Sequence, residues 1–150
     1  MNLFLVLKYI HVMLAVTAVG TNITYAVWGA RARQTPEHLG FALRGIKFLD
    51  DRVANPCYIL LLLTGVAMAA IHYSFTTRFI EIGIVLWVVL AGLAAGQYSP
   101  TLRKQIDALD AGGTESELFK QLDRRATAIG IPLAIIALLI VLDMVVKPSF

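Results

Sequence analysis

Four long apolar runs, separated by shorter polar or basic stretches, dominate the pattern along the chain. They cover residues of about 3–28, 57–73, 78–98 and 126–146. Each run approaches the roughly 20 residues that an α-helix needs to cross about 30 Å of hydrocarbon. The pattern therefore predicts an all-α, four-helix transmembrane bundle in which residues 1–150 form a single integral membrane domain.

Helical signals continue into the two long connections that follow the first and third runs. Pro36 and Glu37 can open a helix, and the Asn55-Pro56 pair marks a start or a kink before the second run. Thr114 with Glu117 three residues later has the pattern of a capping box, which predicts that the last helix begins well before the membrane. We therefore expect amphipathic helical extensions of the spans, and for the first connection either a basic amphipathic helix on the membrane surface or an extension of the second span. In the first connection, the apolar positions recur at helical spacing at Leu39, Leu43, Ile46, Leu49 and Val53.

Small and polar residues predict which faces of the spans pack against protein. Gly65 allows close packing of the second span, and Gly92 with Gly96 forms a GxxxG pair on the same face as Glu81 in the third span, which predicts a helix contact surface. The short loop at residues 74–77 predicts that spans two and three form a tight antiparallel hairpin. The face of the first span that must point into the protein comprises Lys8, His11, Ala15, Ala18, Asn22 and Tyr25.

The composition supports a membrane location and argues against a nucleic-acid partner. Hydrophobic residues make up 58% of the chain and charged residues 15%, and the mean hydropathy is +0.73. The formal net charge is +3, but the basic residues lie in the connections and form no stripe with interleaved aromatic residues. The single cysteine, Cys57, cannot form an internal disulfide.

The distribution of basic residues predicts the orientation of the bundle. Connections that carry Lys and Arg remain in the cytoplasm, so both termini should face outward, with the helical extensions on the cytoplasmic side. The predicted location is the bacterial inner (cytoplasmic) membrane, with the termini in the periplasm. Ten of the thirteen basic residues lie in these two connections: Arg31, Arg33, Arg44, Lys47, Arg52, Arg103, Lys104, Lys120, Arg124 and Arg125.

This topology gathers the ionisable residues of the spans at the outward end of the bundle. Such residues are costly in a bilayer, so each one is a hypothesis for a functional site. The residues at this end are Lys8, His11, His72, Arg78, Glu81, Asp143 and Lys147.

Two kinds of chemistry fit this group. His11 and His72 on facing helices suit axial ligation of a haem iron, with Lys8 or Arg78 near the propionates. A proton relay through His11, Glu81 and Asp143 is the second. A zinc or copper site is less favoured, because the spans supply only two histidines and Cys57 lies at the opposite end.

Each of these residues also has a purely structural interpretation. Lys8 can extend its ammonium group to the headgroups, and His72 is close enough to water to be an interfacial residue. Glu81 favours the positive end of its helix, and Asp143 can pair with Lys147 one turn later. His11 can be a buried histidine that is hydrogen-bonded to a neighbouring helix.

Several short motifs resemble a known family over nearly the whole chain. They are LKYIHVMLAVTAVG at 7–20, PCYILLLLTGVAMA at 56–69, YSP at 98–100 and MVVKP at 144–148. With these motifs the chain is similar to a family of small four-span bacterial predicted integral membrane proteins of unknown function.

A more distant resemblance rests on Lys8-x-x-His11, followed by Val16-Thr17 and Gly20. This pattern is similar to the opening helix of the small membrane protoporphyrinogen oxidases and of copper-resistance membrane proteins. The resemblance implies haem b at His11, as in the oxidases. Only Lys8 and His11 match residue for residue, and the sequence after Gly20 departs from the ending expected in the oxidases.

Three functions are therefore carried forward. The chain could bind haem b or another redox cofactor, act as a non-catalytic accessory subunit of a larger membrane complex, or form a proton or ion pathway. Expected partners are the lipid bilayer and either other membrane subunits or further copies in a homo-oligomer. The sequence has no Gly-rich phosphate loop and no Ser/His/Asp arrangement placed for nucleophilic catalysis, so catalytic residues, and whether the chain is an enzyme, stay open.

Overall fold

The structure, a computed structural model, describes residues 2–148 and consists of helices joined by short turns. Four long helices are each apolar enough to cross a membrane, which confirms the predicted all-α four-helix bundle. The second and third of them each contain a π-helical segment. In chain order the elements are α1 (Leu3–Arg33), α2 (Pro36–Leu49), η1 (Asp50–Ala54), α3 (Asn55–His72), α4 (Arg78–Leu93), η2 (Ala94–Tyr98), α5 (Ser99–Gly112) and α6 (Glu117–Val146).

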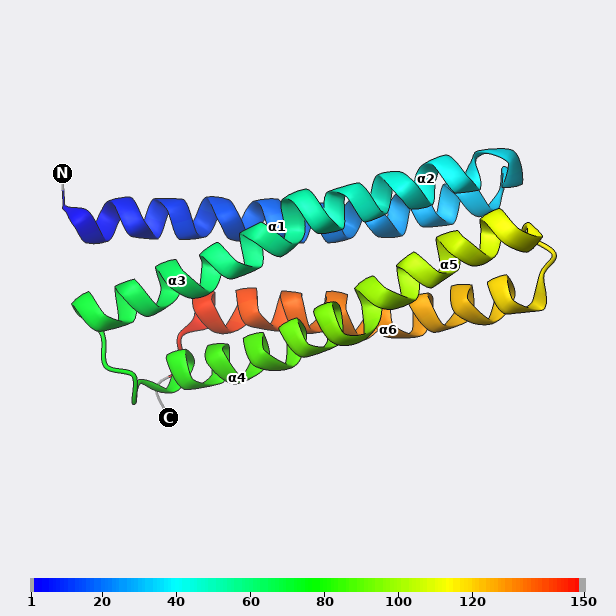
Figure 1. Ribbon diagram of the computed structural model, residues 1–150. Coiled ribbons are helices and arrows are strands. Elements are labelled where there is room, and N and C mark those ends of the chain that lie inside the picture. Colours follow the sequence, from blue (N-terminus) through cyan, green and yellow to red (C-terminus); the bar gives the residue numbers. More distant parts are fainter. Residues whose placement is uncertain (1, 149–150) are drawn as a thin grey trace.

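The extensions predicted from the connections are helical and continue the spans. α2 and α5 form one end of the bundle, where they pack against each other and against α1 and α6 respectively. We call this the basic end, and the opposite end, where α1 begins and α6 finishes, the open end (Figure 1). The core of the basic end is made by Tyr25, Ala32, Leu39, Leu43, Ile46, Ala54, Leu102, Ala108, Phe119 and Leu122.

The start of α2 at Pro36 is as predicted, whereas the capping residue of α6 is not the predicted Thr114. The residue that caps α6 is Ser116, whose Oγ accepts a hydrogen bond of 3.5 Å from the backbone N–H of Phe119. The predicted capping box at Thr114 and Glu117 is therefore wrong. The turn explains the difference, because Gly113 ends α5 with φ of 69° and the chain needs the following residues to reverse direction.

Both π-helical segments end just before a proline. The backbone N–H of Asn55 donates to the carbonyl oxygen of Asp50, and that of Ser99 donates to the carbonyl oxygen of Ala94, five residues back in each case. Pro56 and Pro100 follow directly, and neither has an N–H to continue the usual ladder. The π segments are thus the local response of a long helix to a proline in its interior.

The contact between the second and third long helices changes across these segments. α2 packs against α5, whereas α3 and α4 make few contacts with each other. α3 packs against α1 and α4 against α6, as α2 and α5 respectively also do. In the view of Figure 1, α3 runs obliquely away from α1 towards the open end.

The predicted tight hairpin between spans two and three is therefore wrong. α3 and α4 are consecutive in the chain but make few contacts with each other. Their close-approach positions face other helices. A Cβ at Gly65 would lie 3.3 Å from His11 of α1, and one at Gly83 would overlap the Met144 side chain of α6.

The GxxxG pair is also not used as predicted. Gly92 and Gly96 are exposed, and a Cβ at either position would meet no atom within 4 Å among the described residues. α4 instead packs on α6 through Leu90, which lies in a cluster with Leu133 and Ala137. The predicted contact surface is left free within the described part of the chain.

Candidate functional site

A cavity of about 950 Å³ opens between the two helix pairs at the open end. Its walls come from α1, α3, α4 and α6 and are almost entirely apolar, with Phe79 and Trp87 among the larger side chains. The ionisable side chains on its wall are Lys8, His11, Tyr58, Tyr73 and Lys147. Its size and polarity are those of a site for an apolar small molecule or cofactor with a few polar groups.

The hydrogen bonds of Thr64 determine how His11 is presented. The Thr64 hydroxyl lies 2.7 Å from the carbonyl oxygen of Leu60 and 3.2 Å from that of Leu61, and it can donate its hydrogen to either. The same hydroxyl oxygen lies 2.8 Å from His11 Nδ1 and, with its hydrogen directed to a carbonyl, accepts a hydrogen bond from the ring. In this arrangement a neutral His11 carries its hydrogen on Nδ1 and keeps a lone pair on Nε2, which is the state of a metal-binding imidazole.

Gly65 gives His11 its place against α3. A Cβ at this position would lie 3.3 Å from His11 Cε1, so any side chain here would displace the ring. The predicted protein-facing side of α1 agrees with this contact, because Ala18 and Tyr25 on the same face are buried. Lys8, which was expected on that face, is exposed at the mouth of the cavity.

A second cation stands at the mouth. Lys147 adopts a left-handed conformation that ends α6, and its Nζ donates to the Tyr73 hydroxyl at 3.2 Å. The same Nζ lies 5.4 Å from the ring centroid of Tyr73 and 5.5 Å from that of Phe79. Lys147 thus bonds to Tyr73 across the mouth rather than to Asp143, one turn earlier.

His72 and Arg78 lie outside the cavity wall. The His72 ring is exposed and packs on Phe4, with ring centroids 4.4 Å apart. His72 lies eight residues beyond Thr64, which at 1.5 Å per residue is about 12 Å further along α3 than the level of His11. The structure does not bring the two histidines together. Arg78 is exposed and pairs with Glu81 at 3.8 Å.

The residues of the predicted proton relay are also separate. Glu81 is exposed at the start of α4. Asp143 is buried in α6, and its Oδ2 has no hydrogen-bond partner in residues 2–148. That oxygen lies 3.5 Å from the position of a Cβ at Gly83. In the described range, no hydrogen bond links His11, Glu81 and Asp143.

A smaller cavity of about 280 Å³ lies near the basic end. Asp50 and Tyr25 line it, and Asp50 Oδ2 and the Tyr25 hydroxyl are buried without a hydrogen-bond partner in the described chain. Beside them, Asn22 Nδ2 donates to the Tyr58 hydroxyl at 2.6 Å. Asp50 lies outside the apolar spans, and burial raises the pKa of its carboxyl group above the ordinary value, while the side chain of Ser99 and the charge of Lys47 oppose that rise.

The model of one protein family, described as "Predicted integral membrane protein (DUF2269)", matches residues 5–148. The chain belongs to the DUF2269 family. No curated protein and no solved structure matches it. As a DUF2269 protein with four candidate spans, it is a multi-pass integral membrane protein in contact with the lipid bilayer.

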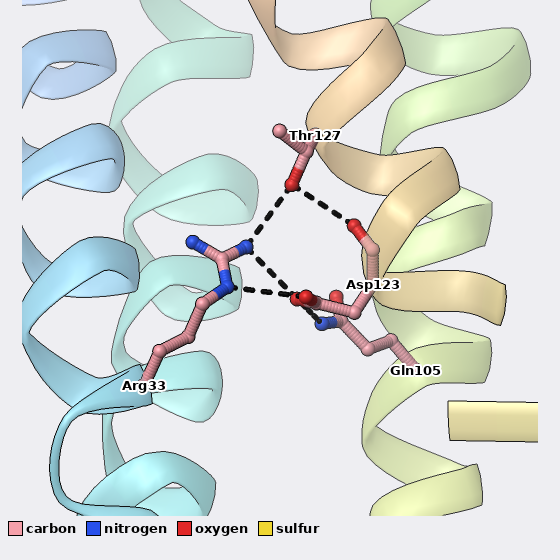
Figure 2. Close-up of polar contacts among 4 residues, drawn as sticks. All are labelled: Arg33, Gln105, Asp123 and Thr127. Atoms are coloured by element: carbon pink, nitrogen blue, oxygen red, sulfur yellow. Dashed lines mark hydrogen bonds and ion pairs between the residues drawn. The ribbon is translucent and has the colours of Figure 1, made fainter. Parts of the chain in front are cut away.

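A polar network closes the smaller cavity of the DUF2269 chain at the basic end (Figure 2). Arg33, from the last turn of α1, donates to both carboxylate oxygens of Asp123 in α6, at 3.1 and 2.8 Å. Its Nη2 also donates to Thr127 at 3.0 Å. Gln105 of α5 donates to Asp123 at 2.8 Å. The Asp123 carboxylate thus links α6 to both α1 and α5.

Sequence reasoning missed the residues of the smaller cavity. Asp50 lies in a basic connection, where charges were interpreted only for topology, and Tyr25 was expected simply to face protein. The available signal was Asn55-Pro56, which marked a break in the helix one turn after Asp50. No local pattern indicates that the break would place Asp50 beside Tyr25.

Proposed function

We propose that this protein binds haem b, or a redox cofactor with the same ligand chemistry, in the cavity at the open end. His11 is the axial ligand in this proposal. The observation that carries it is the position of His11 on the wall of an apolar cavity with its Nδ1 engaged by the Thr64 hydroxyl at 2.8 Å, so that Nε2 is the nitrogen left for a bond to iron. Metal-binding histidines are held by such a bond from their other nitrogen.

The remaining lining fits the same ligand. An apolar wall suits a large ring system, and Lys8 and Lys147 at the mouth can bind two carboxylates. Haem would supply one-electron redox chemistry when bound. The residues of the chain orient it and exclude water. The proposal uses His11 and Lys8 from the predicted set, and it assigns no ligand role to His72 or Arg78.

The absorbance spectrum of the purified protein tests this proposal. In mild detergent, with or without added haem, we expect a Soret band that His11→Ala abolishes or shifts. His72→Ala is the matched control and should leave the band unchanged. Absence of any Soret band after haem is added would refute haem binding. An unchanged band in His11→Ala would show that His11 is not the ligand.

A second candidate function is supported by the free face of α4. Exposed Gly92 and Gly96 form a surface on which another membrane helix can pack closely, as expected for an accessory subunit of a larger complex. Gly92→Leu with Gly96→Leu should then abolish co-purification of a partner in mild detergent. A wild-type protein that runs alone at monomer size would contradict this candidate.

A further inference from the structure

The smaller cavity contains two polar atoms whose burial is uncompensated. Asp50 is 4% exposed and Tyr25 is 9% exposed, and Asp50 Oδ2 and the Tyr25 hydroxyl have no partner within residues 2–148. Burying polar atoms without hydrogen bonds is unfavourable. The cavity of about 280 Å³ that they border can hold several waters at about 30 Å³ each. Water is therefore the partner that the geometry calls for.

We propose that this cavity is a hydrated proton-binding site, in which bound water joins the Asp50 carboxyl group to the Tyr25 hydroxyl group. The Asp50 carboxylate takes up one proton from water at the basic end of the bundle. The resulting carboxylic acid O–H donates to the bridging water, which donates in turn to the Tyr25 oxygen. When Asp50 loses the proton, the direction of these hydrogen bonds reverses.

The cation nearest to Asp50 is already engaged by other groups. Lys47 Nζ lies 4.0 Å from Asp50 Oδ2, too far for a hydrogen bond. Its ammonium group donates instead to Asp51 and, at 3.1 Å, to Ser99 Oγ. Asp50 therefore has no full counter-charge, and a proton can supply it. The titratable groups around Asp50 are Tyr25 of α1, Lys47 of α2, Asp51 of η1, Tyr58 of α3 and Tyr98 of η2. Arg33 of α1 also lines the cavity, and its guanidinium group pairs with Asp123.

The backbone on both sides of the cavity is unusual in the same way. Asp50 begins η1 and Tyr98 ends η2, and both side chains line the cavity. Single π-helical turns recur at functional sites because they redirect side chains out of the regular helical register. The two π-helical segments at this cavity thus contribute a carboxyl group, from Asp50, and an aromatic hydroxyl group, from Tyr98, to its lining.

Charged groups that reach the surface lie next to this site at the basic end. Asp51 is the next residue to Asp50 and its side chain is exposed, while Lys47, which it binds, is largely buried. The site does not depend on the larger cavity, so it stands whether or not a cofactor binds near His11.

Infrared difference spectroscopy during a pH titration tests the proposal on the purified full chain in lipid nanodiscs. We expect the carbonyl stretch of a protonated carboxylic acid to persist at a pH well above the ordinary aspartate value of about 3.9. Asp50→Asn should remove it, whereas Asp51→Asn should not. Tyr25→Phe should shift its frequency, since it removes the hydroxyl at the far end of the water bridge.

Asp143→Asn is the matched control, because Asp143 is the other buried carboxyl group with an unpartnered oxygen but lies outside the cavity. In Asp143→Asn, the part of the carbonyl band that Asp50→Asn removes should still be present. If Asp50→Asn does not fold, Tyr25→Phe in protein labelled with ¹³C-aspartate reports the same shift. The proposal is overturned if Asp50→Asn leaves the band intact, or if Tyr25→Phe leaves the frequency of the band unchanged. It is also overturned if addition of Na⁺ at constant pH removes the band from the wild-type protein.

Discussion

A single hydroxyl group fixes the orientation of the candidate ligand His11. Thr64 accepts from His11 Nδ1 when its own hydrogen is directed to the carbonyl oxygen of Leu60 or Leu61. Replacing the hydroxyl by a methyl group therefore removes the bond that selects the tautomer, while it keeps the size of the side chain.

We predict that Thr64→Val weakens haem binding about 10- to 100-fold, the usual effect of losing the second hydrogen bond of a metal-binding histidine. Titration with haem, followed at the Soret band, measures the change. Thr17→Val is the control, because the Thr17 hydroxyl bonds only to the Met13 carbonyl oxygen in its own helix. Equal affinities of the two variants would contradict the role of Thr64.

The carboxylate of Asp123 should contribute more to stability than that of an exposed ion pair. Asp123→Ala leaves Gln105, which is 1% exposed, without its partner, so we expect a loss of about 1–3 kcal/mol in the free energy of unfolding. Asp110→Ala breaks a pair with Arg44 in which both side chains are 54% exposed, and should cost about 0–1 kcal/mol. Denaturant titrations in detergent compare the two variants, and a larger loss in Asp110→Ala would refute the ranking.

Asp50 makes the stability of the protein depend on pH. Because burial raises the pKa of Asp50 in the folded protein, the folded state holds this proton more tightly than the unfolded state does. Its contribution is fully present below the unfolded pKa and is lost as the pH rises through the folded pKa. Thermal unfolding from acid to neutral pH should therefore show a fall in stability that Asp50→Asn reduces and Asp51→Asn does not. An identical pH profile in wild type and Asp50→Asn would contradict this assignment.

At the scale of elements, the prolines after η1 and η2 determine where the helix pairs separate. Pro56→Ala restores an N–H that can donate to the carbonyl oxygen of Arg52, so η1 should revert towards α-helix. We expect the distance between the open ends of α3 and α4 to shorten.

Spin labels at Val66→Cys and Val85→Cys, which are both exposed, measure this distance in a Cys57→Ser background. Pro132→Ala is the matched control, because Pro132 lies inside α6 without a π-helical segment. An unchanged distance in Pro56→Ala, or an equal change in Pro132→Ala, would show that the proline does not set the separation.

The sequence predicted the elements well because their signals are local. Run length identified the four long helices, and the spacing of Leu39, Leu43 and Ile46 identified α2, in which all three are buried. Helix pairing was not predictable, because it depends on contacts such as His11 with Gly65, which lie far apart in the chain. A GxxxG pattern or a short turn indicates that a helix can pack closely, but not against which partner.

The candidate site was predictable to the same limited extent. His11 and Lys8 are unusual residues for an apolar run, so their own positions revealed them, and both line the larger cavity. The depth of His72 depends on where α3 packs along α1, and the lack of a hydrogen bond from Lys47 to Asp50 depends on Lys47 binding Asp51 more closely. The spacing of residues along the sequence indicates neither of these two features.

At the scale of the whole molecule, the start of α1 and the end of α6 lie at the same end of the bundle (Figure 1). With the basic residues at the other end, we predict that both termini face the periplasm. An alkaline phosphatase fusion after Val146 should therefore be active, and one after Gly113 inactive. The reverse pattern would overturn the orientation.

The preference of α3 for α1, and of α4 for α6, has a consequence for how the protein is made. Residues 3–72 and 78–146 are two helical hairpins, each of which contacts chiefly itself beyond the π segments. The first hairpin can therefore complete most of its contacts before the second leaves the ribosome. We expect the two hairpins to enter the bilayer one after the other, so that assembly ends with the docking of α5 on α2.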